Sequence, residues 1–310
     1  MRLFLHKIIR LGDFMYYKSI TSRNNLTYSI DMIRLKTYIS YNKFSSIEFA
    51  FDTVYQEYVS KKYTSARMEQ FFFNYNIEIE EGKSFWFGFL HNTEKRGEVT
   101  DTQGKYNFTI EFNPNKLKDN FLIKYLLNIS NEWYLRSYDL AIDIKVNILD
   151  IIFDKGRKRK VQTYSNGFDD LTYRIGCSES DVKLKIYNKK IESKLDIPYD
   201  LTRIEISRKL EDFPISAIKT LKFGQENFPE IFLNNYICSL SEYQDKTLYA
   251  IVYAIQNGFP LNNLSRVYKE KIKKMFEGGS KICFSDKEAT QILHQIVFAY
   301  FINNNEMRWM

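Results

Sequence analysis

The stretch YDLAIDI, residues 138–144, says most about how this chain folds. Asp139, Ala141 and Asp143 stand at alternate positions, and apolar residues fill the positions between them. Because successive side chains of a β-strand point to opposite faces, residues at alternate positions share one face. The stretch therefore predicts a strand with two carboxylates on one side and an apolar surface on the other.

The stretch KLKIYNKK, residues 183–190, repeats this pattern with different chemistry. Lys185, Tyr187 and Lys189 share one face of the expected strand, and apolar residues take the other face. This segment predicts a second two-faced strand, whose polar side carries a tyrosine between two cations.

A third segment, TRIEIS at residues 202–207, has the same alternation. Arg203, Glu205 and Ser207 share its polar face, and isoleucines lie between them. Earlier in the chain, Glu111 also stands between two apolar neighbours in a short β-prone run. Each segment thus predicts a strand with one polar and one apolar face.

If these strands belong to one sheet, their polar faces bring carboxylates, a tyrosine and cations together. Oxygen ligands of this kind suit Mg²⁺ or Mn²⁺, and such an ion polarises a phosphate. Cations beside a tyrosine favour its ionised, nucleophilic form, and Lys185, Lys189 and Arg203 are the candidates for this role or for direct phosphate contact. The alternative is an ordinary half-exposed strand surface decorated with charge pairs.

The rest of the pattern predicts an α+β fold with a central antiparallel β-sheet, flanking helices and a mainly helical C-terminal third. The pair Asn166-Gly167 indicates a tight hairpin turn. We expect one domain over residues 1–212 and a helical region over residues 213–310. The expected strands are 28–39, 84–90, 107–112, 137–146, 161–165, 171–175, 182–189 and 201–207, and the expected helical stretches are 118–131, 218–221, 248–255, 267–275 and 289–302.

Composition restricts the class of protein. The 310 residues carry a net charge of +7, which favours a polyanionic partner such as nucleic acid. Cys177, Cys238 and Cys283 form no CxxC pair and are odd in number, which argues against a disulfide framework or a zinc site. The longest apolar stretch, 248–255, is too short to span a bilayer, and the N-terminus does not resemble a signal peptide. We therefore expect a cytoplasmic protein with no membrane partner.

Four segments, in a fixed order, resemble the trans-acting replication initiator (Rep) family of Gram-positive rolling-circle plasmids. They are IEFNPNKL (110–117), YDLAIDI (138–144), RIGCSESDVKLKIYNKKIES (174–193) and TRIEISRKL (202–210). Together they span about a third of the chain. The most specific feature is the turn at Gly176 followed by a strand that ends in IYNKK.

The resemblance implies an HUH-like nuclease fold that lacks the His-hydrophobic-His metal motif, in a protein that works as a homodimer. In agreement, His6, His91 and His294 are far apart in the sequence. The implied activity is sequence-specific, metal-dependent nicking and strand transfer at the double-strand origin, through a 5′-phosphotyrosyl intermediate on Tyr187. The free 3′-hydroxyl would prime the host DNA polymerase, and a host helicase would be recruited.

In this family acidic residues bind the Mg²⁺ or Mn²⁺ ion. The matching positions here are Glu111, Asp139, Asp143 and Glu205, with Asp143 and Glu205 as first choices. The family pattern also leads us to expect an arginine close to the first aspartate. The nearest one here is Arg136, which leaves the role of that arginine open.

Origin recognition in this family is associated with the C-terminal part, which here is the region 213–310, together with possible dimer contacts. A basic stretch at 264–280 matches it, and a solvated helix face is the alternative interpretation. A second basic run, at 155–160, lies beside the predicted hairpin and favours phosphate contact over base reading. The candidate DNA-binding residues are Arg157, Lys158, Arg159, Lys160, Arg266, Lys269, Lys273 and Lys274.

Two other functions remain open. A relaxase or phage-type initiator of an integrative element would use the same chemistry, but such proteins often carry an N-terminal helix-turn-helix segment, which is not evident here. A non-catalytic DNA-binding regulator would need neither nucleophile nor metal. The joint presence of Tyr187, Lys189, Asp143 and Glu205 argues against this last interpretation.

Overall fold

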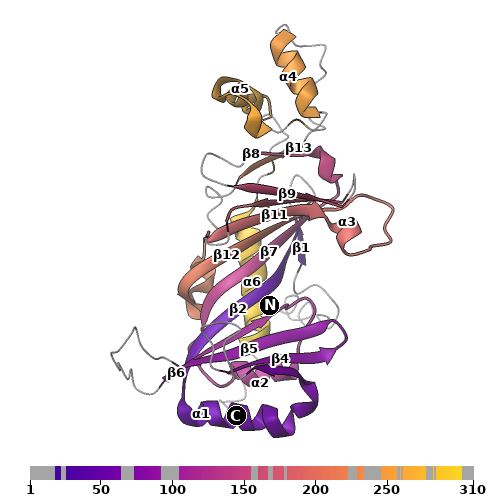
Figure 1. Cartoon of the computed structure of the whole chain (residues 1–310). Helices are drawn as coiled ribbons and strands as arrows, with labels where there is room; N and C mark the ends of the chain where they lie inside the picture. Colours follow the sequence, from indigo (N-terminus) through magenta and orange to yellow (C-terminus); the bar gives the residue numbers. More distant parts are fainter. Residues whose placement is uncertain are drawn as a thin grey trace, which may run out of the picture.

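A computed structural model gives the arrangement of the chain (Figure 1). It describes residues 18–21, 26–63, 73–91, 105–154, 160–166, 170–177, 180–222, 229–233, 246–256, 259, 261–276, 282 and 284–301.

A large antiparallel β-sheet dominates these residues, with the strand order β3-β4-β5-β6-β2-β7-β12-β11-β10-β9 and β1 paired to β2. The long central strands β2 and β7 join its two halves. The strands are β1 (Lys18–Thr21), β2 (Leu26–Ser40), β3 (Val59–Tyr63), β4 (Phe73–Glu80), β5 (Lys83–His91), β6 (Lys105–Phe112), β7 (Tyr134–Ile144), β9 (Val161–Ser165), β10 (Leu171–Ile175), β11 (Val182–Asn188) and β12 (Thr202–Pro214).

A small ribbon and several helices complete the described structure. The ribbon pairs β8 (Ile151–Asp154) with β13 (Glu230–Leu233). The α-helices are α1 (Tyr41–Phe49), α2 (Phe121–Leu127), α3 (Lys189–Glu192), α4 (Lys246–Gln256), α5 (Arg266–Phe276) and α6 (Asp286–Phe301). Shorter turns are the π-helical η1 (Ala50–Val54) and the 3₁₀ segments η2 (Gln56–Tyr58), η3 (Ile148–Asp150), η4 (Ile215–Thr220) and η8 (Leu261–Asn263).

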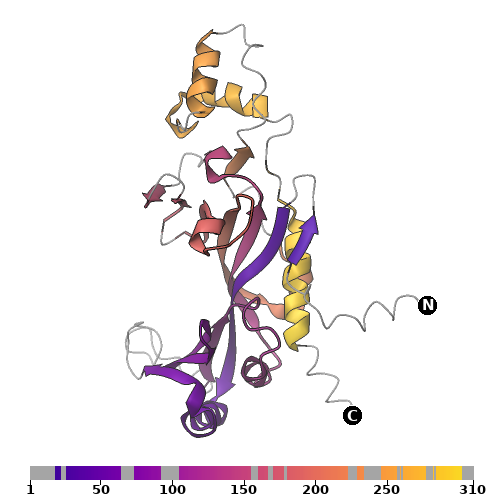
Figure 2. The same ribbon diagram turned by 90° about the vertical axis from the view of Figure 1, so that its right-hand side faces the viewer.

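Helix α6 covers one face of the sheet along β1 and β2 (Figures 1 and 2). The face that it covers is the apolar one, on which Ile204, Ile142 and Tyr28 lie side by side on β12, β7 and β2. Ile292 and Leu293 of α6 are completely buried in the same core. Burial of each such aliphatic side chain contributes about 1.5–3 kcal/mol, so the last described helix is a major part of the core.

Aromatic side chains fill the core at the other end of the sheet. Phe44 of α1 packs edge-on against Phe89, with ring centroids 4.9 Å apart. Phe51 of η1 contacts Phe87 at 4.7 Å, and Phe87 stacks on Tyr75 at 4.8 Å. Rings in these geometries attract one another beyond their simple burial. The many phenylalanines and tyrosines of the sequence therefore serve packing here.

The predicted α+β class, with a central antiparallel sheet, flanking helices and a helical C-terminal part, is confirmed. All eight expected strands are present. The two strands of the predicted hairpin, β9 and β10, pair with each other, and Ser165 faces Leu171 at the end nearest the turn. The helix expected at 118–131 is shorter, because α2 begins after its N-cap Asn120 and ends at Leu127. Helix α1 was not expected. Only two of its side chains, Phe44 and Ile47, are buried, so its sequence carries little of the apolar spacing that predicts a helix.

The boundary expected at residue 212 stays a prediction. Strand β12 continues to Pro214, and α6 from the expected C-terminal region packs on the main sheet. Within the described residues, no helix is both long and apolar enough to cross a membrane.

Candidate active site

Strand register brings the predicted tyrosine and two of its predicted neighbours into one row. Tyr187 on β11 faces Arg203 on β12, and Arg203 in turn faces Asp143 on β7. Directly opposed residues of antiparallel strands have Cβ atoms about 4.5–5.5 Å apart. The convergence expected from the alternating pattern is therefore found for these three side chains.

Two further rows continue the polar face along the same strands. Lys185 faces Glu205, and Ser207 faces Asp139. Glu111 lies farther across the sheet on β6, where it forms an ion pair with Arg34 of β2. The four predicted carboxylates thus share one face, but Glu111 stands apart from the tyrosine row.

Tyr187 is almost completely shielded, with 3% of its surface exposed. Its hydroxyl donates a hydrogen bond to Oε2 of Glu205 at 3.2 Å. The ammonium groups of Lys185 and Lys189 lie 3.9 Å and 5.7 Å from the centre of its ring. This arrangement places a general-base candidate at the hydroxyl and two cations at the ring.

Of the cations expected to favour the ionised form of this tyrosine, Arg203 acts in that direction, but burial outweighs it. Burial raises the pKa of Tyr187 far above its usual value, and the charge of Glu205 raises it further, while Arg203 acts in the opposite direction. Desolvation disfavours the phenolate more than one guanidinium can favour it. The buried hydroxyl therefore favours its protonated form.

Arg203 is fixed by two carboxylates. It donates through Nε and Nη2 to the two oxygens of Asp143 and through Nη1 to Asp31. These charge-assisted bonds raise the pKa of Arg203 above its ordinary value although burial opposes this. Both oxygens of Asp143 are thus occupied, so Asp143, a first choice as metal ligand, is bonded to an arginine here.

Asp31 is a site residue that the sequence alone did not reveal. It lies at a bulge of β2, where the pairing with β7 shifts register between Ile30 and Met32. The side chain of Asn115 donates to the carbonyl of Ile30 at 2.7 Å and to Oδ1 of Asp31 at 3.1 Å. A bulge inserts one extra residue and re-aims a side chain. The only sequence signal was Asn115 within the segment IEFNPNKL.

Asp139 lies among like charges. Burial raises the pKa of its carboxyl to about 6, against the hydrogen bond from Ser207, and the charges of Glu205, Glu111 and Asp31 raise it further. Carboxylates that repel one another in this way are hard oxygen donors for a divalent cation. Even so, nowhere in the described ranges do three or more acidic, histidine or cysteine side chains converge as a metal site requires.

The asparagine of the IYNKK segment has a structural role. Asn188 precedes the short helix α3, and its side chain accepts a hydrogen bond from the backbone N–H of Ile191 at 3.2 Å. Lys189 begins that helix and pairs with Glu192 at 2.8 Å. This cap ends the strand one residue beyond Tyr187, so the tyrosine lies at the end of β11.

The turn between β10 and β11 explains the glycine of the resemblance. Gly176 has φ of +110°, and a Cβ there would stand 3.2 Å from the carbonyl oxygen of Val182. A side chain would be both strained and crowded in this position. The glycine therefore allows the close return of the chain into the strand that carries Tyr187.

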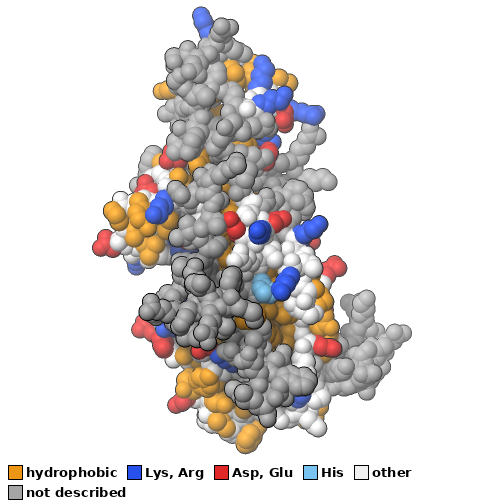
Figure 3. Space-filling model, turned by 180° about the vertical axis from the view of Figure 1, so that it is seen from behind, with side chains coloured by type: hydrophobic (Ala, Val, Ile, Leu, Met, Phe, Trp, Pro, Cys, Tyr) orange, Lys and Arg blue, Asp and Glu red, His pale blue; other side chains and the backbone are white. Residues whose placement is uncertain are grey.

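The residues predicted to contact DNA differ in their surroundings. Lys269 and Lys273 of α5 both form ion pairs with Asp154, which is buried at the end of β8. Arg266 and Lys274 are exposed on the same helix. Lys and Arg side chains gather at the end of the molecule that contains α5 (Figure 3).

Of the second basic run, the described residues include Lys160 alone. Lys160 is exposed just before β9, whereas Arg157, Lys158 and Arg159 lie outside the described residues. Arg136, the arginine expected near the first aspartate, forms an ion pair with Asp212 at 2.7 Å.

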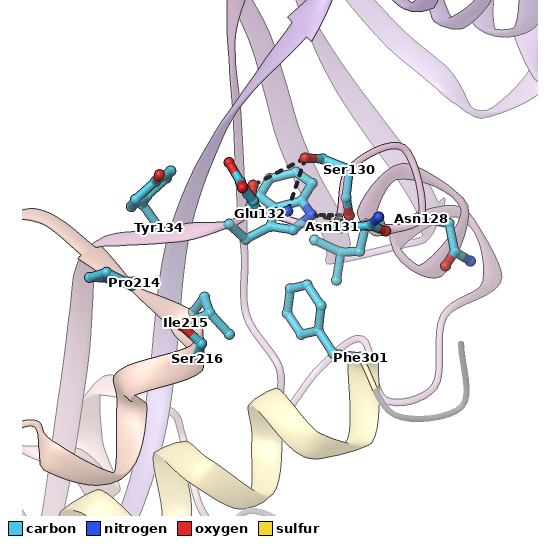
Figure 4. A pocket seen from close by; sticks show the side chains of 11 residues that line it. Asn128, Ser130, Asn131, Glu132, Tyr134, Pro214, Ile215, Ser216 and Phe301 are labelled. Atoms are coloured by element: carbon cyan, nitrogen blue, oxygen red, sulfur yellow. Dashed lines mark hydrogen bonds between the residues drawn. The ribbon is translucent and has the colours of Figure 1, made fainter. Parts of the chain in front are cut away.

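A separate cavity of about 470 Å³ lies beside the end of α6 (Figure 4). Its walls include Glu132 and Trp133 from the segment before β7, Ile215 from η4 and Phe301 from α6. None of the predicted site residues lines it. The chemistry expected for Tyr187 therefore belongs to the polar face of the sheet and not to this cavity.

Two curated relatives match this chain, and both are named replication initiation proteins of Staphylococcus aureus. One is 26% identical over 60% of this chain, and the other is 34% identical over 42% of it. The chain spans 59% and 45% of their respective lengths. These matches confirm the expected likeness to replication initiators.

Among solved structures, the chain is similar to a rolling circle replication initiator protein from Geobacillus stearothermophilus. The TM-score is 0.40 and the identity 12%, over 81% of this chain and 97% of that one. No protein-family model matches the sequence.

Proposed function

We propose that this chain initiates rolling-circle replication of a plasmid by cutting one strand of its double-strand origin with Tyr187. The observation that carries the proposal is the contact between the Tyr187 hydroxyl and Glu205, within a row that also holds Arg203 and Asp143. A tyrosine with a carboxylate at its hydroxyl and cations at its ring has the parts that nucleophilic attack on a phosphodiester requires. The likeness to replication initiation proteins supports the same choice.

In the strand-transfer step, one ester bond of the scissile phosphate replaces another. Glu205 accepts the phenolic proton, and the Tyr187 oxygen forms a bond to the scissile phosphorus. The bond from phosphorus to the 3′-oxygen breaks, and that oxygen takes a proton to become the free 3′-hydroxyl. The 5′-phosphate stays on Tyr187 as a phosphotyrosyl ester, which conserves the energy of the bond for a second transfer.

The buried state of Tyr187 gives its lysine neighbours a role in this step. The ammonium groups of Lys185 and Lys189 lie near the face of the ring. A phosphate is a stronger partner for an ammonium group than an aromatic ring is. We infer that an incoming phosphate draws these side chains away and uncovers the tyrosine, so that nucleophile exposure depends on substrate.

A divalent cation, Mg²⁺ or Mn²⁺, is part of the proposal. Asp139 and Glu205 would hold it, because they lie in adjacent rows and the charge of Glu205 raises the pKa of Asp139. Asp143 would have to leave Arg203 before it could join them. When bound, the ion would draw charge from the phosphate oxygens.

Nicking of a supercoiled plasmid that carries the origin adjoining this gene tests the proposal. With Mg²⁺, the wild type should give open circles with protein attached to the 5′ end, and Tyr187→Phe should give none. Tyr164→Phe is the matched control, because Tyr164 is an exposed tyrosine on β9. A covalent adduct on Tyr187→Phe would reject the assignment.

Tyr173, the other tyrosine nearby, is poorly placed for this role. It faces Ile186 across the strands and packs on Phe153 at 5.1 Å, on the apolar side of the sheet. Origin binding without any nicking by the wild type would favour a non-catalytic regulator. A relaxase or phage-type initiator would nick a transfer origin in preference to the plasmid's replication origin.

The partners follow from the same likeness and are proposals as well. They are a second copy of the chain, a host helicase, and a host DNA polymerase that extends the 3′-hydroxyl. All of them place the protein in the cytoplasm.

A further inference from the structure

Two hollows adjoin on the polar face of the sheet and share a wall. One, of about 410 Å³, is lined by Asp139 and Lys209, and the other, of about 460 Å³, by Glu205. Lys183 and Ser207 line both. The two hollows therefore form a double depression, and Glu205, the hydrogen-bond partner of Tyr187, lies in the wall of one of them.

Two lysines and the predicted tyrosine stand at regular intervals along one strand of this depression. Lys183, Lys185 and Tyr187 stand at alternate positions on the polar face of β11. Alternate residues of a strand are about 7 Å apart, which is comparable to the spacing of successive phosphates in an extended single strand. A DNA strand whose scissile phosphate reached Tyr187 would have its next phosphates beside these two lysines.

Some cations of this surface form ion pairs with carboxylates, and others do not. Arg34 is bonded to Glu111 and Arg136 to Asp212, so these arginines hold neighbouring strands together. In the described part of the chain, neither Lys183 nor Lys209 forms an ion pair.

Their positions agree with a contact to DNA. Lys209 is exposed on β12 and Lys183 is half-buried on β11. Among the described residues that line the two hollows, none has an aromatic ring on which a base could stack. A strand held here would therefore be bound through its backbone.

We propose that Lys183 and Lys209 bind backbone phosphates of single-stranded DNA next to the cleaved bond, in the double hollow over Ser207. The proposal rests on the proposed function of Tyr187, because that function places the scissile phosphate at Tyr187, whose partner Glu205 lines the hollow. Positively charged grooves that follow the backbone are a usual way to bind a single strand. Binding at this subsite is independent of base sequence.

Fluorescence anisotropy with a labelled oligodeoxythymidine strand tests the subsite. The full-length Tyr187→Phe protein is used as background, so that binding is read without cleavage. Each of Lys183→Gln and Lys209→Gln should reduce the slope of log affinity against log salt by about 0.7, the value for one phosphate contact on a single strand. Lys219→Gln is the matched control, because Lys219 is an exposed lysine on η4, away from the hollows.

The salt slopes of the two lysine variants test the phosphate contacts. An unchanged slope in both variants, with unchanged thermal melting, would overturn it. An equal loss of slope on a blunt duplex would overturn the choice of single-stranded DNA. If the lysine variants lose slope while wild type fails to nick any plasmid, the subsite stands and the nicking function fails.

Discussion

The guanidinium of Arg203 donates to both carboxylate oxygens of Asp143, from Nε to Oδ1 at 2.6 Å and from Nη2 to Oδ2 at 2.8 Å. The two residues are 6% and 9% exposed, so the pair is largely out of water. Removal of one partner from such a pair leaves the other charge buried and uncompensated. The pair therefore fixes the row that contains Tyr187.

Asp143→Ala should lower the free energy of unfolding by about 3 kcal/mol, the lower end of the range for broken buried pairs, because Asp31 still contacts Arg203. Urea denaturation measures this. Glu80→Gln is the control, because its pair with Lys83 is exposed and should contribute less than about 1 kcal/mol. A loss of under about 1 kcal/mol in Asp143→Ala would contradict the structural role of the pair.

Asp139 makes stability depend on pH in an unusual direction. Its pKa is about 6 in the folded chain and 3.8 for a free carboxyl, so folding favours the protonated form. The stabilisation is complete below about pH 4 and is lost as the pH rises through about 6. With a chelator present, the free energy of unfolding of the wild type, relative to that of Asp139→Asn, should fall by on the order of 2 kcal/mol between about pH 4 and about pH 6.

Urea denaturation at a series of pH values gives this difference. A difference that stays constant, or that grows in favour of the wild type as the pH rises, would show that Asp139 is ionised without penalty. Addition of Mg²⁺ at neutral pH should raise the melting temperature of the wild type more than that of Asp139→Asn, because the ion would relieve the repulsion.

The two lysines Lys273 and Lys274 should respond differently to substitution, although they are neighbours. Lys273 pairs with Asp154 at 2.6 Å and also with Glu230, whereas Lys274 is exposed. Lys273→Ala should speed hydrogen exchange along α5, because it weakens the attachment of the helix to the ribbon.

Lys274→Ala should leave that exchange unchanged. If Lys274 contacts the origin duplex, its removal should reduce the salt slope of binding by about 0.9. Equal protection of α5 in both variants would show that the ion pairs with Asp154 do not hold the helix.

Asn115→Ala should slow nicking while the affinity for origin DNA stays the same. Its side chain holds the bulge that carries Asp31, and Asp31 holds Arg203 beside Tyr187. The loss of these hydrogen bonds should also cost about 1–2 kcal/mol of stability. Single-turnover nicking and a binding titration separate the two effects. Asn128→Ala, at an exposed helix end, is the control.

Much of the candidate site could be predicted from the sequence because it depends on strand parity. Alternation placed Tyr187, Arg203 and Asp143 on polar faces, and the register of β11, β12 and β7 then aligned them. Parity cannot reveal a bulge, so Asp31 was missed. It also cannot show burial, so the desolvation that raises the pKa of Tyr187 was not anticipated.

The ion pairs of α5 could not be predicted from the sequence for a different reason. Lys269 and Lys273 meet Asp154 only because the chain folds back over more than a hundred residues. A basic amphipathic helix has the same appearance whether its lysines face a phosphate or a buried carboxylate. Only the tertiary contact distinguishes the two.

The return of α6 to the main sheet limits how this protein can be recombined with its relatives. An exchange of everything after residue 212 would replace the helix that covers the apolar side of β2, together with α4 and α5. A chimera intended to transfer origin preference should therefore exchange residues 246–276 alone and keep 284–301 from the recipient. Under the proposed function, the exchanged part would then be an insert within the fold, between two segments that must match each other.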